Sequence, residues 1–517
     1  MVFVVIIHLS GCGDMGHERR SHKPVPGGML KMVTYKISTL NPVNDLSVYE
    51  SFIINQLYEG LVELDAGMNP VPGLADFWTI NDSFTQFAFR IRPHIPTTRG
   101  EFVTAMDVRS SFENLIRIDA ARPTAIHHFI AEIVGVDEWL AGETTEISGM
   151  IVPDGTHIKF QLKHSTPDFL YFFATDQAKI LLTDDAQPGK LMGAGPFTVD
   201  SFSDEGMTLL PFKNYFRGSP YLDSIVIHFD DTGLEDSFGQ LLNGQVNLID
   251  CPLWGVDSLA KQPGIVVQKR LSLGFEFMGM RVDRPGLDNK NLRNSIARHI
   301  DWARLDSVEI PYFMMAQGVI PPGMDGYRPN LKNPFRQPYS QQNPGKLIPA
   351  KFSDSLIFGI TDSLIAETEE SWIFDDFIEY PLPVKSKVLS WTDFDAALTN
   401  GSMDFFTLGW VAEIPSTSRY LYNLFHSKGV GNYFGYQNTN VDRLIEKALG
   451  ATDKAQQTVL CQAIEDSILE DVPLIPLNFV FNAFAYDSHL QGFKLSELGF
   501  STLNCEELWF DNIGADQ

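Results

Sequence analysis

The sequence predicts an α/β protein with more than one structural unit, and three observations support this class. The chain has 517 residues, which is too long for one hydrophobic core, so two to four units are expected. Hydrophobic residues make up 44% and charged residues 20%, a composition typical of globular proteins. Beyond residue 355, apolar runs alternate with helical stretches, which favours strands joined by helical crossovers. There we expect strands at 356–360, 387–389 and 405–408, and helices around 363–377 and 392–398.

The amino-terminal half shows similar local signals. Residues 48–61 carry apolar side chains at a helical spacing, namely Phe52, Ile53, Leu57 and Leu61. Thr104 precedes a helical pattern and is a favourable N-cap residue. We therefore expect the following order of elements: a strand at 32–35, a helix at 48–61, a strand at 84–91 and a helix that begins after Thr104.

The charge of the chain argues against one class of partner. Asp and Glu number 65 and Lys and Arg 39, which gives a net charge of −26. Such a surface repels phosphate backbones, so no nucleic-acid partner is predicted. Simple solubility explains the charge, and steering of a cationic ligand is the alternative.

The cysteine pattern predicts no metal site and no cofactor. The four cysteines are scattered, and none has the spacing of a zinc ligand set. They are Cys12, Cys251, Cys461 and Cys505. One disulfide is possible among them, but the sequence does not select a pair.

The first residues have the pattern of a secretory signal. Residues 2–9 form a short apolar run that ends in Leu9-Ser10-Gly11-Cys12. This tetrapeptide resembles a bacterial lipobox, in which the cysteine is acylated and anchors the protein to a membrane. We therefore expect a signal peptide with a lipobox at 1–12, lipidation at Cys12 and a polar tether at 13–30. Plain secretion is the alternative. No later segment reaches the length of a membrane span.

The stretch 403–449 contains the strongest candidate for a binding site. A buried-strand pattern at 405–409 leads to Trp410 and Glu413, which we expect in a loop, and an amphipathic helix follows from about residue 441. An aromatic residue and a carboxylate three residues apart at the end of a strand are suited to gripping a ligand. The alternative is a tryptophan packed on the core and a glutamate that faces water.

Signatures of catalysis are poor in this sequence. It contains no GxSxG, no GxxxxGK[ST] and no HExxH motif. The glycines at 429–435 do not have the spacing of a dinucleotide loop, and a turn explains them better. The adjacent histidines at 127 and 128 fit either packing or a ligand contact. No enzymatic activity is predicted.

A series of motifs resembles one known family along nearly the whole chain, from about residue 30 to 510. The motifs occur in family order and include LYEGLVELD, PVPGLADFW, FAFRIRPHI, FVTAMDVRSSFENL, GAGPF, FKNYFRG, LRNSIARHID, GVIPPG and EDVPLIP, together with the stretch 405–449. This series resembles the family 5 extracellular solute-binding proteins, which are the dipeptide-, oligopeptide- and nickel-binding subunits of bacterial ABC importers.

The resemblance implies a bilobal, periplasmic-binding-protein-like fold of type II, cluster C, with an extra small α/β subdomain in the first lobe. The expected division places lobe I at 31–75, 190–272 and 491–517. The small subdomain is expected at 76–189, and lobe II at 273–490. Two lobes of this kind close over a solute and shift between open and closed states.

The resemblance also implies site residues. Relatives hold the ligand's ammonium with an aspartate three residues after the Trp of a Gly-Trp pair, and this chain has Glu413 there, after Gly409 and Trp410. The extra methylene moves the carboxylate by about 1–1.5 Å, so either the anchor is kept with a shifted register or the ligand is not a peptide. The weaker candidates are Glu50, Thr124, His127, Asn432 and Phe277; for Phe277 and its neighbour Phe275, core packing is the alternative.

Together these features predict an extracytoplasmic, lipid-anchored solute-binding protein. It is expected to act as a monomer, to capture a peptide or peptide-like solute, and to deliver it to the permease subunits of an ABC transporter. Contact with the membrane is expected through the lipid anchor only, in the periplasm or at the cell surface. The alternatives are a non-peptide solute (a nickel chelate, haem or a sugar) or a sensory module on the same fold.

Overall fold

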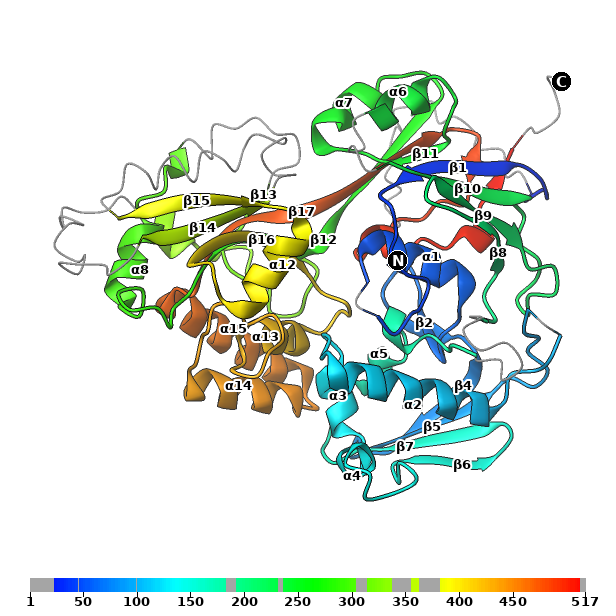
Figure 1. Ribbon diagram of the computed structural model, residues 1–517, viewed down its shortest axis with the longest axis horizontal. Coiled ribbons are helices and arrows are strands. Elements are labelled where there is room, and N and C mark those ends of the chain that lie inside the picture. Colours follow the sequence, from blue (N-terminus) through cyan, green and yellow to red (C-terminus); the bar gives the residue numbers. More distant parts are fainter. Residues whose placement is uncertain are drawn as a thin grey trace, which may run out of the picture.

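A computed structural model describes residues 23–44, 46–98, 100–182, 192–230, 236–303, 314–336, 355–361 and 382–511. It confirms the α/β class. The strands and helices form two parts, and two long strands cross between them (Figure 1). The expected helix at 363–377 and Cys12 lie outside the described residues.

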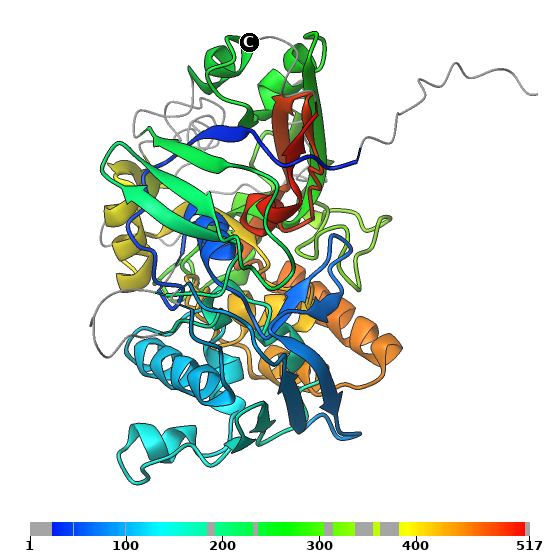
Figure 2. The ribbon, with the colours of Figure 1, turned by 90° about the vertical axis from the view of Figure 1, so that its right-hand side faces the viewer.

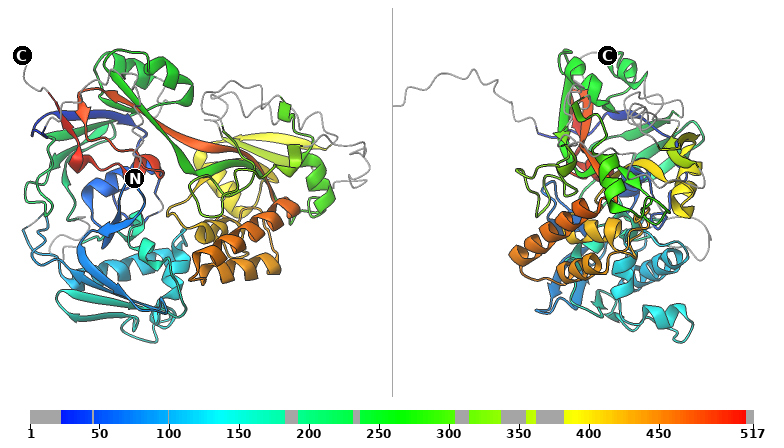
Figure 3. Two further views of the ribbon diagram at one scale, coloured as in Figure 1. Left: turned by 180° about the vertical axis from the view of Figure 1, so that it is seen from behind. Right: turned by 90° about the vertical axis from the view of Figure 1, so that its left-hand side faces the viewer.

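One mixed sheet runs through both parts of the molecule. Its strand order is β15-β14-β16-β12-β17-β11-β1-β10-β9-β8, with β13 paired to β17. The crossing strands are β12 (Ile265–Met280) and β17 (Leu474–Asp487), which pair antiparallel. Their pairing is interrupted by an irregularity between Leu271 and Phe275. Figure 3 shows, from behind, how the two strands pass from one part of the molecule to the other.

The part that we name lobe I lies at one end of this sheet. Its strands are β1 (Met29–Thr34), β8 (Phe197–Phe202), β9 (Gly206–Pro211), β10 (Ser224–Phe229) and β11 (Leu248–Asp250). Its helices are α1 (Val48–Leu57), α6 (Ser237–Leu242) and α7 (Val256–Leu259). β1 pairs parallel with both β10 and β11. The carboxy-terminal strands β18 (Leu490–Gln491) and β19 (Trp509–Phe510) form a separate pair.

A smaller antiparallel sheet, which we name the small subdomain together with its helices, lies below lobe I (Figure 2). Its strands are β4 (Ala75–Ile80), β5 (Gln86–Ile91), β6 (Met150–Asp154) and β7 (His157–Gln161). Its helices are α2 (Ala105–Ala121), α3 (His127–Glu132), α4 (Val136–Leu140) and α5 (Phe169–Phe172). Its core also includes Leu61, Leu74 and Met192, which lie outside the expected range of 76–189.

Lobe II is built on the other end of the large sheet. Its strands are β13 (Met314–Met315), β14 (Leu356–Thr361), β15 (Val384–Leu389) and β16 (Phe405–Val411). Its helices are α8 (Lys290–Ala297), α12 (Trp391–Asn400), α13 (Thr417–Phe425), α14 (Thr439–Leu449) and α15 (Lys454–Asp471).

Local sequence explains where several helices begin. Thr104 caps α2 as expected: its side chain accepts a hydrogen bond from the N–H of Asp107, and the Asp107 carboxylate bonds back to Thr104. The helix expected at 48–61 is shorter, because Tyr58 is already extended, with ψ at 159°. The next residue, Glu59, is buried and accepts hydrogen bonds from Tyr215 and Arg217, so tertiary contacts end this helix.

A hairpin between lobe I and the small subdomain reaches lobe II. Its strands are β2 (Val62–Leu64) and β3 (Pro70–Pro72), and Met68 lies in the turn between them. Met68 has a left-handed backbone, with φ at 65°, and is 8% exposed within the hydrophobic cluster of lobe II. The two lobes are therefore in apolar contact at this turn.

Among the described residues, Cys251, Cys461 and Cys505 are buried and have no disulfide partner. In the same part of the chain, no helix is both long and apolar enough to cross a bilayer.

Candidate functional site

The outer edge of β16 is open where it approaches the crossing strands. On its inner side, β16 pairs with β12 along its whole length, from Met280↔Phe405 to Gly274↔Val411. On its outer side, β14 pairs only with Phe405 and Phe406. Within the described residues, no strand covers residues 407–411 on that side. An open edge of this kind offers main-chain donors and acceptors to an extended partner.

Trp410 belongs to this strand. The sequence placed it in a loop, and the structure corrects this: β16 continues to Val411 because Trp410 and Val411 still pair with Phe275 and Gly274 of β12. The indole is half-buried and lies on Gly431, where an added Cβ would come within 2.7 Å of the ring. The indole Nε1 is buried without a hydrogen-bond partner among the described residues.

Glu413 lies two residues beyond the end of β16 and is half-buried. The main chain is fixed just before it, where the N–H of Ala412 donates to the carbonyl of Leu273 on β12 at 2.9 Å. Burial, and after it the negative charge of Glu413, raise the pKa of Tyr420 of α13 well above its ordinary value. The buried Tyr420 hydroxyl has no hydrogen-bond partner among the described residues. Polar groups therefore gather at the end of the open edge.

Glu50 makes hydrogen bonds within its own loop. Its Oε1 accepts hydrogen bonds from the N–H and hydroxyl of Ser38 at 2.7 and 2.6 Å, and its Oε2 accepts one from the N–H of Ser47 at 2.9 Å. Burial raises the pKa of Glu50, but these hydrogen bonds outweigh it, so the pKa lies below its ordinary value. The residue completes the capping box of α1 and organises the preceding loop, and its role as a ligand contact stays a prediction.

Thr124 and His127 are both directed toward Asp119 of α2. The Thr124 hydroxyl donates to Oδ1 of Asp119 at 2.9 Å, and His127 Nδ1 lies 2.6 Å from Oδ2. The hydrogen bond to Asp119 raises the pKa of His127. The structure places this pair within the small subdomain and gives no contact that joins either residue to Trp410 or Glu413 in its described part.

Asn432 supports the loop that follows α13. Its Nδ2 donates to the carbonyls of His426 and Tyr436, at 3.1 and 2.7 Å, and its Oδ1 accepts from the N–H of Tyr436 at 3.0 Å. The loop it supports contains Gly431, against which Trp410 lies. Asn432 therefore supports the open edge only indirectly, through this loop.

Phe277 corrects an expectation. Its side chain is 0% exposed, and its ring lies 5.0 Å from Phe275 and 5.5 Å from Phe434, between ring centroids. Both Phe275 and Phe277 belong to the hydrophobic cluster of lobe II. For this pair the structure supports core packing, the alternative that the sequence left open, because both side chains are fully buried.

A polar interface that the sequence analysis missed lies immediately after Glu413. Arg419 of α13 donates from Nε and Nη2 to the two oxygens of Asp168 in the small subdomain, both at 3.0 Å. The Ser416 hydroxyl donates to Asp168 Oδ2 at 2.7 Å. These contacts join lobe II to the small subdomain. One local hint of this interface exists in the sequence. Arg419 stands three residues before Tyr422 and four before Asn423, so the three side chains share one face of the helix.

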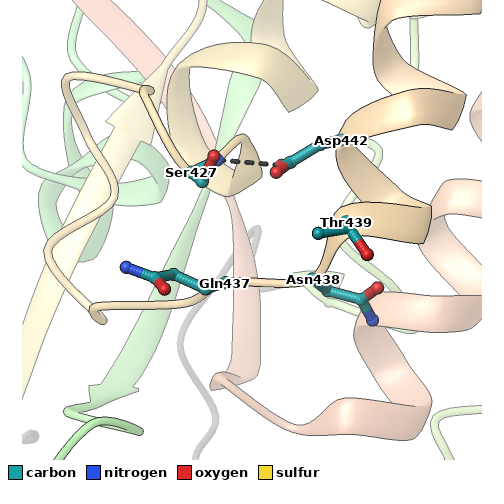
Figure 4. A pocket seen from close by; sticks show the side chains of 5 residues that line it. All are labelled: Ser427, Gln437, Asn438, Thr439 and Asp442. Carbon is teal, nitrogen blue, oxygen red and sulfur yellow. Dashed lines mark hydrogen bonds between the residues drawn. The ribbon is translucent and has the colours of Figure 1, made fainter.

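A separate polar pocket opens on lobe II at the start of α14. It is lined by Ser427, Gln437, Asn438, Thr439 and Asp442 (Figure 4). The N–H of Ser427 donates to Oδ1 of Asp442 at 2.9 Å across it. None of the predicted site residues lines this pocket. Among the residues that the structure describes, no group of three or more His, Cys, Asp or Glu side chains is arranged to hold a metal ion.

Two α/β lobes joined by crossing strands, with an open strand edge that ends at a carboxylate, define the class of two-lobed binding proteins. A comparison with protein families identifies the family within this class. Residues 69–347 match the model described as "Bacterial extracellular solute-binding proteins, family 5 Middle". The chain belongs to family 5 of the bacterial extracellular solute-binding proteins. The predicted family and fold are thereby confirmed, and a solute-binding family agrees with the prediction that the chain is not an enzyme.

Known relatives match almost end to end at low identity. The oligopeptide-binding protein OppA of Bacillus subtilis is 20% identical over 527 residues, which cover 95% of each chain. The periplasmic binding protein DppA of Helicobacter pylori, solved with the peptide STSA, has a TM-score of 0.81 at 20% identity and covers 94% of this chain and 99% of its own. AgaA of A. tumefaciens R10, solved with agropinic acid, has a TM-score of 0.79 at 20% identity, with coverage of 94% and 99%.

Proposed function

We propose that this protein captures a peptide or peptide-like solute between its two lobes and delivers it to the permease of an ABC importer. The solute extends along the outer edge of β16, and its ammonium group pairs with the carboxylate of Glu413. Trp410 forms one wall of this site. The protein acts as a monomer.

The observation that carries this proposal is the open edge of β16 with Glu413 at its end. Main-chain pairing along a strand edge gives affinity without regard to side-chain sequence, which suits a carrier of varied peptides. A carboxylate at the end of the edge fixes where an amino terminus begins. Residues 407–411 pair with β12, one of the two crossing strands, so a bound chain would lie one strand away from the region about which the lobes move.

The relatives support the same class of solute. OppA is named for binding oligopeptides, and the DppA structure contains a peptide. The AgaA structure contains agropinic acid, so the fold also accepts a solute that is not a peptide. A non-peptide solute is therefore the second candidate function for this chain.

The experiment that tests the proposal begins with native mass spectrometry of the purified protein, which identifies whatever co-purifies. Calorimetry then compares trialanine with N-acetyl-trialanine. We expect the acetylated peptide to bind at least about tenfold more weakly, because acetylation removes the charge that pairs with Glu413. Equal binding of the two peptides would exclude the ammonium anchor. A co-purified solute without an amino terminus, together with no binding of trialanine, would favour the non-peptide candidate.

We further propose that the protein is held at the membrane by acylation of Cys12, which lies outside the described residues. The Cys12→Ser variant is expected to appear in the soluble fraction instead of the membrane fraction, because two or more acyl chains are needed for stable anchoring. Detergent partitioning followed by immunoblotting measures this. A variant that still enters the detergent phase would show that Cys12 is not the anchor.

A further inference from the structure

The segment that carries Glu413 is held from both sides by different parts of the molecule. Upstream, Ala412 is bonded to Leu273 of β12, so this end belongs to lobe II. Downstream, the side chain of Ile414 is 4% exposed and lies in the hydrophobic core of the small subdomain. Glu413 is the one residue between these two attachments. Its position therefore depends on how lobe II and the small subdomain meet.

A buried ion pair holds lobe II against the small subdomain. The side chains of Arg419 and Asp168 are only 5% and 10% exposed, and their two parallel hydrogen bonds form a fork that constrains orientation as well as distance. The guanidinium carbon of Arg419 also lies 4.2 Å from the ring centroid of Phe129 on α3. Such a fork tolerates little displacement of α13 relative to the small subdomain.

Weaker contacts extend the same interface along α13. The ring of Tyr422 lies 5.1 Å from that of His128, and Nδ2 of Asn423 donates to the carbonyl of Ala125 at 3.3 Å. These contacts repeat along one face of the helix, beside α3 in Figure 1. The Asp168–Arg419 pair carries opposite charges, and Arg419 lies closer in sequence to Glu413 than Tyr422 and Asn423 do.

We propose that Asp168 and Arg419 are positioning residues for ligand recognition: their pairing, supported by Ser416, sets the carboxylate of Glu413 where it meets the charged amino group of the solute. This inference rests on the proposed function, since it gives Glu413 its role as the anchor. The small subdomain then takes part in recognition without touching the solute. Breaking the pair lowers the preference for a charged amino terminus, whereas a simple closing contact would weaken all solutes equally.

The test uses Asp168→Asn and, because this variant leaves Arg419 buried opposite an amide, a second variant in which Asp168→Leu and Arg419→Met remove both charges. Calorimetry measures the ratio of the dissociation constants of N-acetyl-trialanine and trialanine. We expect this ratio to fall at least about threefold in both variants, and the fall to vanish in a Glu413→Gln background. Glu470→Gln, which removes an ion pair with Lys290 elsewhere on lobe II, is the matched control and leaves the ratio unchanged.

Hydrogen exchange of the backbone amides within 414–423, measured without peptide, separates the positioning role of Asp168 and Arg419 from the anchor role of Glu413. Faster exchange in the variants together with a lower ratio supports positioning. Positioning is overturned if exchange is faster but the ratio of dissociation constants is unchanged, or if both peptides bind equally more weakly. It is also overturned if exchange does not change in the variants. A wild-type protein that does not distinguish the two peptides would refute the anchor role of Glu413, and with it positioning, even where the exchange data show that the interface exists.

Discussion

Replacement of Glu413 by alanine is expected to weaken the binding of a free peptide at least about tenfold, because an ammonium group held near the lobe junction loses its counter-charge. The midpoint of thermal unfolding is expected to change little, since Glu413 is half-buried at the end of a strand and does not belong to the apolar core. Calorimetry with trialanine and a thermal melt of the ligand-free protein measure the two effects.

Two controls sharpen this expectation. Glu413→Asp keeps the charge and is expected to retain most of the affinity, with a change that reflects the shorter reach. Glu470→Ala removes a carboxylate whose side chain is 77% exposed and is expected to leave binding unaltered. If Glu413→Ala binds trialanine as tightly as the wild type does, Glu413 is not part of the site.

Replacement of Phe277 by alanine is expected to lower the free energy of unfolding by about 3–5 kcal/mol, as for other fully buried aromatic residues. The physical reason is its environment: the ring is 0% exposed and packs among Phe275, Phe406 and Phe434. Urea denaturation, followed through the transition of lobe II, measures the loss. The affinity of the folded fraction for trialanine is expected to stay near the wild-type value.

The matched control is Phe77→Ala, because Phe77 is 55% exposed on the small subdomain. Its cost is expected to stay within about 1 kcal/mol, since little apolar surface leaves the core. A small loss of stability in Phe277→Ala, combined with a large loss of affinity, would instead return Phe277 to the ligand site.

The sequence predicted those elements whose signals are local. The run 405–408, the helix around 392–398 and the Thr104 cap are confirmed because apolar runs and capping side chains act over a few residues. The capping pair Ser47 and Glu50 has the same local signal, with serine and glutamate three residues apart. The resemblance to relatives placed Glu50 in the ligand site, whereas its hydrogen bonds are made within its own loop.

Features set by tertiary pairing could not be predicted in this way. Trp410 remains in a strand because β12 lies beside it, a fact that no local pattern contains. Asp168 and Arg419 are 251 residues apart in the chain, and each looks like an ordinary surface charge when read alone. Phe277 fits a core strand and a binding surface equally well, and only its neighbours decide between them.

The turn that buries Met68 in lobe II has a thermodynamic consequence. If the lobes separate there, the thioether side chain of Met68 moves from apolar surroundings into water. This exposure adds to the cost of any polar contacts that break. Exposure of apolar surface raises the heat capacity, so opening acquires a curved dependence on temperature. Solute release from this protein would then respond to warming differently from release governed by ion pairs alone.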